Sequence, residues 1–432
     1  MKFVLACFGT RGDVEPGVTL GRELLRRGHE VHIAVTSEMV GFVESAGLTA
    51  ATYGVDAKPV IEAYREFTGY LPPKSFQIHE LIRSWRRYRK LFAECWSDIG
   101  TTLTSLVDRP DLLFTGLGFQ EAAANVAEYY DIPLATLHWF PQRVNSQQFP
   151  YLPAPLSRAA MTLDEWLYWQ MTQKVDNTQR SELGLPKTTA SSPRRIAERG
   201  SLELQGYDEV CFPGLAAEWA RLDVRRPFVG VMTAQLPTNC DDEVASWIAA
   251  GTPPIYFGFG SMWVESPVDT LAMISEACAQ LGERALVCSG QSDWSELPHL
   301  EHVKVVSAVN HSVTFPACRA VVHHGGSGTT AAGLRAGVPS LILWTTGDQP
   351  LWGDRVKRLR VGTTRRFLST TRESLIADLR TILAPQFATR ARALATRMTE
   401  PADSVAKAAD LVEGLARRGR VGLFGKGTFE DS

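Results

Sequence analysis

Side chains and backbone groups able to hold an anion are concentrated in one turn, His324–Thr330, with the sequence HGGSGTT. Glycines let backbone N–H groups approach a ligand closely, and the start of a following helix carries a partial positive charge. Three hydroxyl side chains and an imidazole N–H add further donors. A phosphate or diphosphate suits these donors better than a neutral group. The groups predicted to contact it belong to His324, Gly326, Ser327, Gly328 and Thr329.

Asp348 and Gln349 follow a nearby apolar run, Ser340–Trp344. A carboxylate beside a carboxamide offers acceptors and donors, which suits the vicinal hydroxyls of a sugar. Phosphate donors next to a sugar-binding pair predict a nucleotide-sugar site. The alternative is a purely structural glycine turn. His323, the first of two adjacent histidines, is more simply a satisfied core residue at a strand end.

The elements around this turn follow from the apolar pattern. Ala320–His323 and Ser340–Trp344 are predicted strands, and a short helix from about Thr329 to Ala336 joins them. Gly337 ends the helix. Two strands joined by one helix form a parallel βαβ unit with a right-handed crossover. The turn and the Asp348 loop therefore lie at carboxyl strand ends, where open parallel sheets bind ligands.

A second loop of this kind lies near the N-terminus. Lys2–Phe8 is a predicted strand, and Gly9–Asp13 (GTRGD) follows it with one cation and one carboxylate. A helix that ends at Gly28 and the strand Glu30–Val35 come next. Asp13 is a candidate catalytic base. The alternative is that Asp13 only caps a helix beginning near Val14, because aspartate is a good N-cap residue.

Two stretches of the second half resemble the donor-site motif of GT-B glycosyltransferases: HHGGSGTTAAGLRAG and, after it, TTGDQ. Near the N-terminus, the stretch GTRGDVEP resembles the N-terminal motif of the same group. This group includes glycopeptide-antibiotic, macrolide, sterol and mycobacterial glycopeptidolipid glycosyltransferases. The resemblance covers nearly all of the chain except its middle and tail. It implies an α/β fold of two Rossmann-like, doubly wound parallel-sheet domains that face a cleft.

The resemblance also implies roles for single residues. It makes Asp13 the catalytic base and places Thr10 and Arg11 at the donor diphosphate. It places Ser261 at the same diphosphate and the Val309 backbone at the nucleotide base. The implied reaction is inverting transfer of a hexose or deoxyhexose from a UDP- or dTDP-sugar. We expect no metal or other cofactor, because no Asp-x-Asp pair stands in a glycine-bounded loop and the helix N-terminus can hold the diphosphate.

The acceptor site is predicted from aromatic residues. His138 and Trp139 follow the predicted strand Ile132–Leu137, and an aromatic cluster there suits an apolar or carbohydrate acceptor, although core packing is an equal alternative. The stretch HWFPQRVN resembles that of the mycobacterial glycosyltransferases that modify lipids. This resemblance favours a lipid-linked peptide or glycolipid acceptor over a small metabolite or sterol.

Phe76–Phe92 is predicted to be a basic amphipathic helix. It predicts peripheral contact with anionic lipid, the alternative being a packed helix with a solvated basic side.

Composition excludes several classes of protein. A net charge of −2 and a pI near 6.5 give no electrostatic footprint for nucleic acid. Seven scattered cysteines without a C-x-x-C pair predict neither a disulfide framework nor a zinc site. No apolar run approaches the ~20 residues of a membrane span. We therefore expect a cytoplasmic protein, or one peripheral at the inner membrane face.

Four segments are expected. Residues 1–222 form an acceptor-binding Rossmann-like domain, 223–240 a linker, and 241–400 a nucleotide-sugar-binding Rossmann-like domain. By resemblance, the helix within 401–432 crosses back to the first domain before a tail. Glu209–Phe212 is the predicted last strand of the first domain.

Three further expectations concern the remaining elements. Tyr151–Pro213 is predicted to be an acceptor-side excursion, Phe387–Arg418 a helix, and Val421–Ser432 a frayed tail.

Two other classes of protein share these features. A nucleotide-sugar epimerase of similar build needs no acceptor. A non-catalytic nucleotide-sugar-binding protein would use Asp13 only as a helix cap. Release of a nucleoside diphosphate that depends on an added acceptor separates a transferase from both.

Overall fold

The computed structural model describes residues 1–69, 78–106, 110–149, 151–221, 226–234, 236–260, 266–290 and 300–425. The chain divides into two compact units. Unit 1 comprises Met1–Glu209, Pro213–Ala234 and Pro401–Ser432, and unit 2 comprises Val210–Phe212 and Gln235–Glu400. Each unit has its own sheet and its own core.

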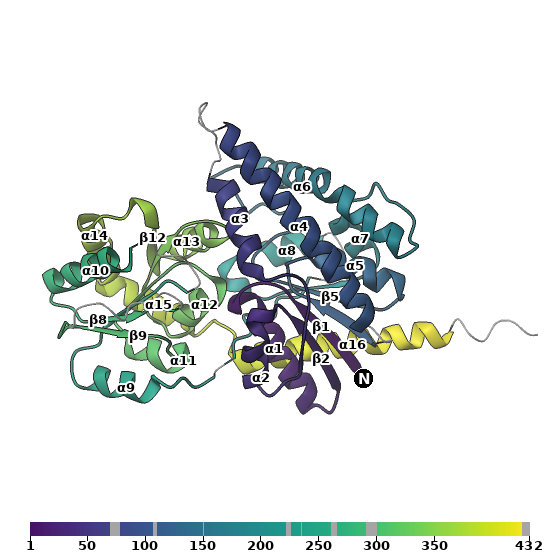
Figure 1. The fold of residues 1–432 in the computed structure, drawn as a ribbon. Coiled ribbons are helices and arrows are strands. Elements are labelled where there is room, and N and C mark those ends of the chain that lie inside the picture. Colours follow the sequence, from purple (N-terminus) through teal and green to yellow (C-terminus); the bar gives the residue numbers. More distant parts are fainter. Residues whose placement is uncertain are drawn as a thin grey trace, which may run out of the picture. The chain divides into compact units, whose positions relative to one another are not determined.

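Unit 1 is built on a six-stranded sheet in the order β3-β2-β1-β4-β5-β6, and every pair is parallel (Figure 1). The central strands are continuous apolar runs because helices cover both faces of such a sheet. The strands are β1 (Lys2–Cys7), β2 (Glu30–Val35), β3 (Ala50–Thr52), β4 (Leu112–Thr115), β5 (Leu134–His138) and β6 (Leu202–Gln205).

Helices α1–α8 and α16 belong to unit 1. The last of them, α16, follows unit 2 in the sequence but packs against α1, β4 and β6 (Figure 1). Arg27 at the end of α1 ties it down by donating to Asp410 at 2.6 Å and to Glu413 at 3.1 Å. The helices are α1 (Arg11–Arg26), α2 (Val40–Ser45), α3 (Ala57–Gly69), α4 (Ile78–Leu106), α5 (Gln120–Tyr129), α6 (Ala154–Glu182), α7 (Ser192–Glu198), α8 (Leu215–Ala220) and α16 (Pro401–Gly425).

Unit 2 repeats the same topology in a second six-stranded parallel sheet, ordered β12-β11-β10-β7-β8-β9. In each unit the first strand pairs with the second and the fourth, which is the doubly wound Rossmann order. The predicted fold class is confirmed. The strands are β7 (Ile255–Gly258), β8 (Ala285–Cys288), β9 (Val303–Val306), β10 (Ala320–His323), β11 (Ser340–Trp344) and β12 (Gly362–Arg366).

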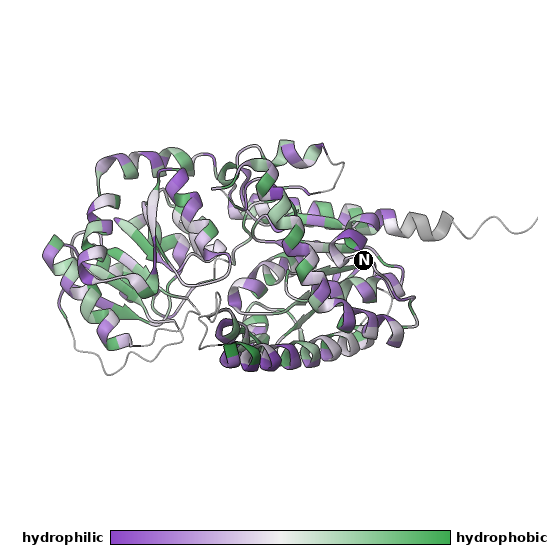
Figure 2. Cartoon of the chain, turned by 90° about the horizontal axis from the view of Figure 1, so that it is seen from above, coloured by the Kyte–Doolittle hydropathy of each residue, from purple (hydrophilic) through white to green (hydrophobic). Residues whose placement is uncertain are grey.

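The helices of unit 2 mix hydrophilic and hydrophobic residues along their length, as helices on a sheet do (Figure 2). They are α9 (Asp241–Ala249), α10 (Pro267–Leu281), α11 (His311–Thr314), α12 (Ser327–Arg335), α13 (Gln349–Arg358), α14 (Arg372–Ile382) and α15 (Pro385–Ala395).

The topology fixes where ligands can bind. In doubly wound sheets, ligands bind outside the carboxyl ends of the strands where the strand order reverses. This switch point lies between β1 and β4 in unit 1, and between β7 and β10 in unit 2. The loops after these four strands are therefore the places to examine for chemistry.

Some predicted elements were wrong. The last strand of unit 1 is Leu202–Gln205, whereas Glu209–Cys211 is a single 3-10 turn. The predicted helix Phe387–Arg418 is two helices, because Pro401 starts α16, which continues to Gly425 past the expected start of the tail. Helix α1 begins at Arg11, three residues before the expected start near Val14.

Candidate functional site

The predicted anion turn joins β10 to α12. Gly326 is the N-cap of α12, and the first backbone bond of the helix runs from Thr330 N to Gly326 O at 2.9 Å. Ser327, Gly328 and Thr329 form the first turn, where backbone N–H groups have no intrahelical acceptor. These three residues are partly exposed. The turn can therefore present N–H groups, hydroxyls and the positive end of a helix to an anion.

His324 links this turn to the end of β7. A Cβ on Gly260 would lie 2.6 Å from His324 Cε1, and a Cβ on Gly326 would lie 2.6 Å from Nε2, so the ring fits only between glycines. Burial lowers the pKa of His324 to about 4, although a hydrogen bond with the Gly258 backbone acts against it. The ring is neutral at pH 7, and its buried Nδ1 has no hydrogen-bond partner within the described ranges.

His323 is a core residue, as expected, but it is not fully satisfied, because its buried Nε2 has no hydrogen-bond partner among the described residues. Its side chain is fully buried, and its Nδ1 accepts a hydrogen bond from Gly325 N at 3.1 Å. Burial lowers its pKa well below the usual value, with smaller contributions from His324 and His311. A neutral imidazole that accepts at Nδ1 positions the glycine turn, because it fixes the Gly325 backbone.

The Asp348–Gln349 loop lies against the same turn. Gly325 has a φ of +98°, and a Cβ there would lie 3.2 Å from Gln349 Cβ. The side-chain amide oxygen of Gln349, Oε1, accepts from Thr345 N at 2.8 Å and from Thr345 Oγ1 at 3.0 Å. Asp348 is half-buried and directly precedes α13. The structure thus brings the predicted diphosphate and sugar residues together, and Gln349 also holds its own loop in shape.

Val309 lies in the loop between β9 and α11 on the same edge of the sheet. Its side chain is buried, and the next backbone N–H, of Asn310, donates to Asp241 at 2.9 Å. His311, two residues on, lies near enough to His323 to affect its pKa. Ser261 lies outside the described residues.

In unit 1, Asp13 occupies the third position of α1, after β1. Its Oδ2 accepts from Thr10 N at 2.6 Å and from Thr10 Oγ1 at 3.0 Å. The bond from the Thr10 N–H to the Asp13 carboxylate is one of the two bonds of a capping box, in which the third helix residue accepts from the N-cap backbone. Burial nevertheless raises the pKa of Asp13 to about 6 against the opposing effect of the Thr10 bonds. The carboxylate is a helix cap and a stronger base than an exposed aspartate.

Gly9 is a site residue that sequence reasoning missed. Its φ is +134°, and a Cβ there would lie only 2.2 Å from Asp13 Oδ2. Gly116, after β4, would place a Cβ 3.6 Å from the Trp139 ring and 3.9 Å from Asp13 O. Asp13 and Trp139 therefore lie at one switch point. A glycine directly after a predicted strand was the available signal.

Arg11 is held inside unit 1. Its exposed side chain donates to Glu15 at 3.2 Å and lies 4.9 Å from the Phe42 ring centroid. Glu15 in turn accepts from Ala234 N at 2.8 Å. These contacts fix the guanidinium near the start of α1.

The two predicted acceptor residues differ in burial. His138 is the last residue of β5 and fully buried, with its Nε2 3.1 Å from Gln120 Oε1. Burial, with help from Arg143, lowers its pKa to about 3. Trp139 is partly exposed. The prediction of acceptor contact therefore rests on Trp139, since His138 is part of a buried polar cluster.

Comparisons with known proteins bear on both units. Residues 3–105 match the family model of the glycosyltransferase family 28 N-terminal domain. Residues 261–416 match that of the erythromycin biosynthesis protein CIII-like, C-terminal domain. An uncharacterized glycosyltransferase of Mycobacterium tuberculosis is 56% identical over 422 residues, which cover 97% of this chain and 100% of the relative. A sterol 3-beta-glucosyltransferase of Arabidopsis thaliana is 31% identical over 84% of this chain and 57% of the relative.

Solved structures share the fold. The glycotransferase of kitacinnamycin superposes with a TM-score of 0.71 at 18% identity, covering 96% of this chain and 99% of that one. The glycosyltransferase VinC, solved in complex with dTDP, gives a TM-score of 0.66 at 20% identity and covers 97% and 100%. At such identities the likeness concerns the fold alone.

Proposed function

Since this chain belongs to the GT-B glycosyltransferases, we propose that it transfers a hexose or deoxyhexose from a nucleoside-diphosphate sugar to an acceptor hydroxyl. The observation that supports this best is the clustering of the α12 turn, His324 and the Asp348–Gln349 loop at the switch point of unit 2. The groups proposed to bind the diphosphate and those proposed to bind the sugar lie together there.

The donor diphosphate is proposed to bind at the N-terminus of α12. A Cβ on Gly328 would meet no atom within 4 Å, so packing does not require a glycine at this position. Close approach of a ligand to the Gly328 backbone does require one. UDP or dTDP is the proposed nucleotide. VinC and another structural neighbour, SsfS6, were solved with thymidine diphosphate, which supports dTDP for this chain as well.

Asp13 is proposed as the general base. It would accept the proton of the acceptor hydroxyl while that oxygen attacks the anomeric carbon from the face opposite the diphosphate, so the configuration inverts. A pKa near 6 leaves the carboxylate charged at pH 7 and makes it more basic than usual. Such proton transfer typically accelerates a reaction ~10²–10⁴-fold. Thr10 holds Oδ2, which fixes the direction of the carboxylate.

Transfer is proposed to be independent of metal. The leaving diphosphate gathers negative charge, and the α12 N-terminus with the Ser327 and Thr329 hydroxyls would stabilise that charge. Fixed donors of this kind can replace a cation. Chelation with EDTA should therefore leave the transfer rate unchanged, and a loss restored by Mg²⁺ would reject this part of the proposal.

A lipid-linked acceptor is favoured by the outer surface of unit 1. Helix α4 contacts both α3 and α6, and the three helices expose apolar side chains. Helix α4 also exposes arginines, which suits an anionic membrane surface. Among them, Arg83 pairs with Glu80 at 2.7 Å and Arg87 with Glu66 at 2.8 Å. The exposed apolar residues are Ile61, Tyr64, Ile78, Ile82, Leu163, Trp166, Leu167 and Met171.

Part of the predicted membrane helix packs inward instead. Tyr88 and Phe92 stack with Phe67 and Phe119, so Ile78 and Ile82 are the apolar residues of α4 left for a membrane. Phe76 and Gln77, at the start of the predicted helix, lie outside the described residues. Flotation with anionic liposomes tests the contact: charge reversal of Arg83 and Arg87 should abolish it. A small-metabolite or sterol acceptor is the alternative, supported by the sterol 3-beta-glucosyltransferase relative.

Product release tests the proposed reaction. The protein is incubated with UDP- and dTDP-sugars, with and without lipid extracts, and the freed nucleoside diphosphate is measured. We expect release only with an acceptor, and a release rate ~10²–10⁴-fold lower from Asp13→Asn. A new sugar nucleotide formed without any acceptor would indicate an epimerase. Binding without turnover would indicate a non-catalytic nucleotide-sugar-binding protein.

A further inference from the structure

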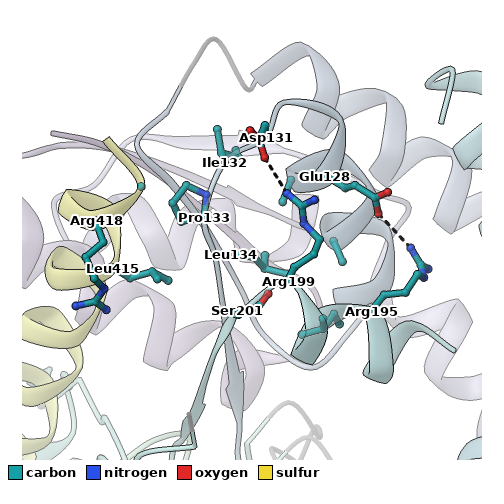
Figure 3. A pocket seen from close by; sticks show the side chains of 15 residues that line it. Glu128, Asp131, Ile132, Pro133, Leu134, Arg195, Arg199, Ser201, Leu415 and Arg418 are labelled. Carbon is teal, nitrogen blue, oxygen red and sulfur yellow. Dashed lines mark hydrogen bonds and ion pairs between the residues drawn. The ribbon is translucent and has the colours of Figure 1, made fainter. Parts of the chain in front are cut away.

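A cavity of about 390 Å³ lies in unit 1 on the edge of the sheet opposite to Asp13 (Figure 3). It is next to the amino ends of β5 and β6, since Leu134 starts β5 and Ser201 directly precedes β6. Helices α5, α7 and α16 form its other walls. The volume is in the range of small-molecule sites. No step of the proposed reaction uses this cavity.

The lining combines apolar side chains with an excess of positive charge. Arg199 pairs with Asp131 at 3.3 Å, whereas Arg418 has no ion-pair partner in the described part of the chain. In Figure 3, Arg418 lies on one side of the cavity and Arg195 and Arg199 on the other. The apolar lining consists mainly of Ala124, Ala127, Ile132, Pro133, Leu134 and Leu415.

Arg195 also lines the cavity, but its charge is balanced by Asp176 and Glu128. The residue is only 8% exposed, and its terminal nitrogens are fixed by Asn125 at 2.8 Å and by Asp176 at 2.7 Å. Its buried Nε has no hydrogen-bond partner among the residues described. Glu128 forms an ion pair with Arg195 at 3.6 Å (Figure 3) and also accepts from both terminal nitrogens of Arg180. The Nε of Arg195 is sealed from solvent, so the guanidinium groups that a ligand in the cavity can reach are those of Arg199 and Arg418, which are exposed.

We propose that this cavity binds a small organic anion, with a carboxylate or phosphate head near the arginines and a short apolar body against the remaining lining. Arginine suits both head groups because its planar N–H donors match their oxygens. Leu415 and Arg418 both lie on α16. A bound anion would therefore also hold α16 against the sheet of unit 1.

Calorimetric titration of the full chain tests the proposal. The probes are octanoate, octyl phosphate, inorganic phosphate and octanol. We expect saturable binding of one of the two octyl anions, and its head group identifies the preferred class. Octanol and inorganic phosphate should bind at least about tenfold more weakly, since each lacks one half of the proposed ligand.

Two neighbouring arginines of α16 provide matched variants. Arg418→Ala should weaken the octyl anion at least about tenfold. Arg417→Ala should leave it unchanged, because Arg417 pairs with Glu413 at 3.1 Å and is not among the residues that line the cavity. Both variants should bind the nucleotide donor as the wild type does. Equal octyl-anion affinity in all three proteins, or no saturable binding by the wild type, would overturn the proposal.

Discussion

At the scale of single residues, Asp13 combines two interpretations that the sequence presented as alternatives. It accepts the Thr10 N–H as a helix cap does, yet burial makes it more basic than a surface carboxylate. The motif around Asp13 and the histidine pair could be found by inspection of the sequence. The importance of Gly9 and Gly260 could not, because it depends on which atom an added Cβ would meet.

Asp13→Asn separates the cap from the base. The amide oxygen can still accept from Thr10, but it cannot take a proton at neutral pH, so transfer should fall ~10²–10⁴-fold. A carboxyl with a folded-state pKa near 6 and an unfolded value of 3.8 stabilises the fold below about pH 4 and loses that contribution as the pH rises through 6. The melting temperature of the variant should therefore rise relative to wild type between pH 4 and pH 7.

Thermal melts at several pH values, together with the product-release assay, check this prediction. If Asp13 were only a cap, the variant would keep its activity.

At the scale of elements, the sequence predicted strands with continuous apolar runs and missed β3, β6 and β12, which have no such run. Ala320–His323 and Ser340–Trp344 have the predicted bounds. Strand β6 escaped notice because Glu203 and Gln205 are as buried as the leucines beside them. Helix α6 escaped notice for a related reason: it exposes leucines and Trp166 while it buries Ser157, Thr172 and Asp176. Because these apolar side chains face solvent and these polar ones face the core, the sequence shows no apolar stripe along one side of the helix.

Arg143→Met tests the polar cluster that holds β6. Arg143 Nε donates to Glu203 at 2.5 Å, and Glu203 is 1% exposed. Removing the arginine leaves a buried carboxylate with a more distant partner, Arg226 at 3.5 Å. Unfolding in guanidinium chloride should show a loss of about 3–5 kcal/mol. Arg194→Met is the control, because its pair with Glu198 is exposed and screened by solvent, so its loss should change the stability little.

Equal losses of stability in Arg143→Met and Arg194→Met would mean that the buried Arg143–Glu203 pair stabilises the fold no more than the exposed Arg194–Glu198 pair does.

At the scale of the whole molecule, the two Rossmann-like units were predictable because each carries its own glycine-rich loop after a strand. The placement of α16 was not predictable from the residues of the second half, and only the family resemblance implied it. The reason is that α16 buries Ala408, Ala409, Val412 and Ala416, small side chains that reveal no partner by themselves.

Ending the chain at Glu400 tests this dependence. Unit 1 would lose the helix that packs on α1, β4 and β6, so it should unfold at a lower temperature, whereas unit 2 should keep its transition. Calorimetry with limited proteolysis of each unit measures the outcome. A chain ending at Gly425 is the control. Unchanged protection of unit 1 would show that α16 is dispensable.

The most direct test of the central claim, that the α12 turn binds the donor diphosphate, is calorimetric titration with UDP, dTDP and GDP. It compares wild type with Gly328→Ala and Gly41→Ala. Both glycines are second residues of helices with open space around a Cβ, so alanine should not harm either fold. We predict that wild type and Gly41→Ala bind UDP or dTDP selectively and that Gly328→Ala binds at least about tenfold more weakly. Equal affinity in all three proteins, or no binding by wild type, would contradict the account.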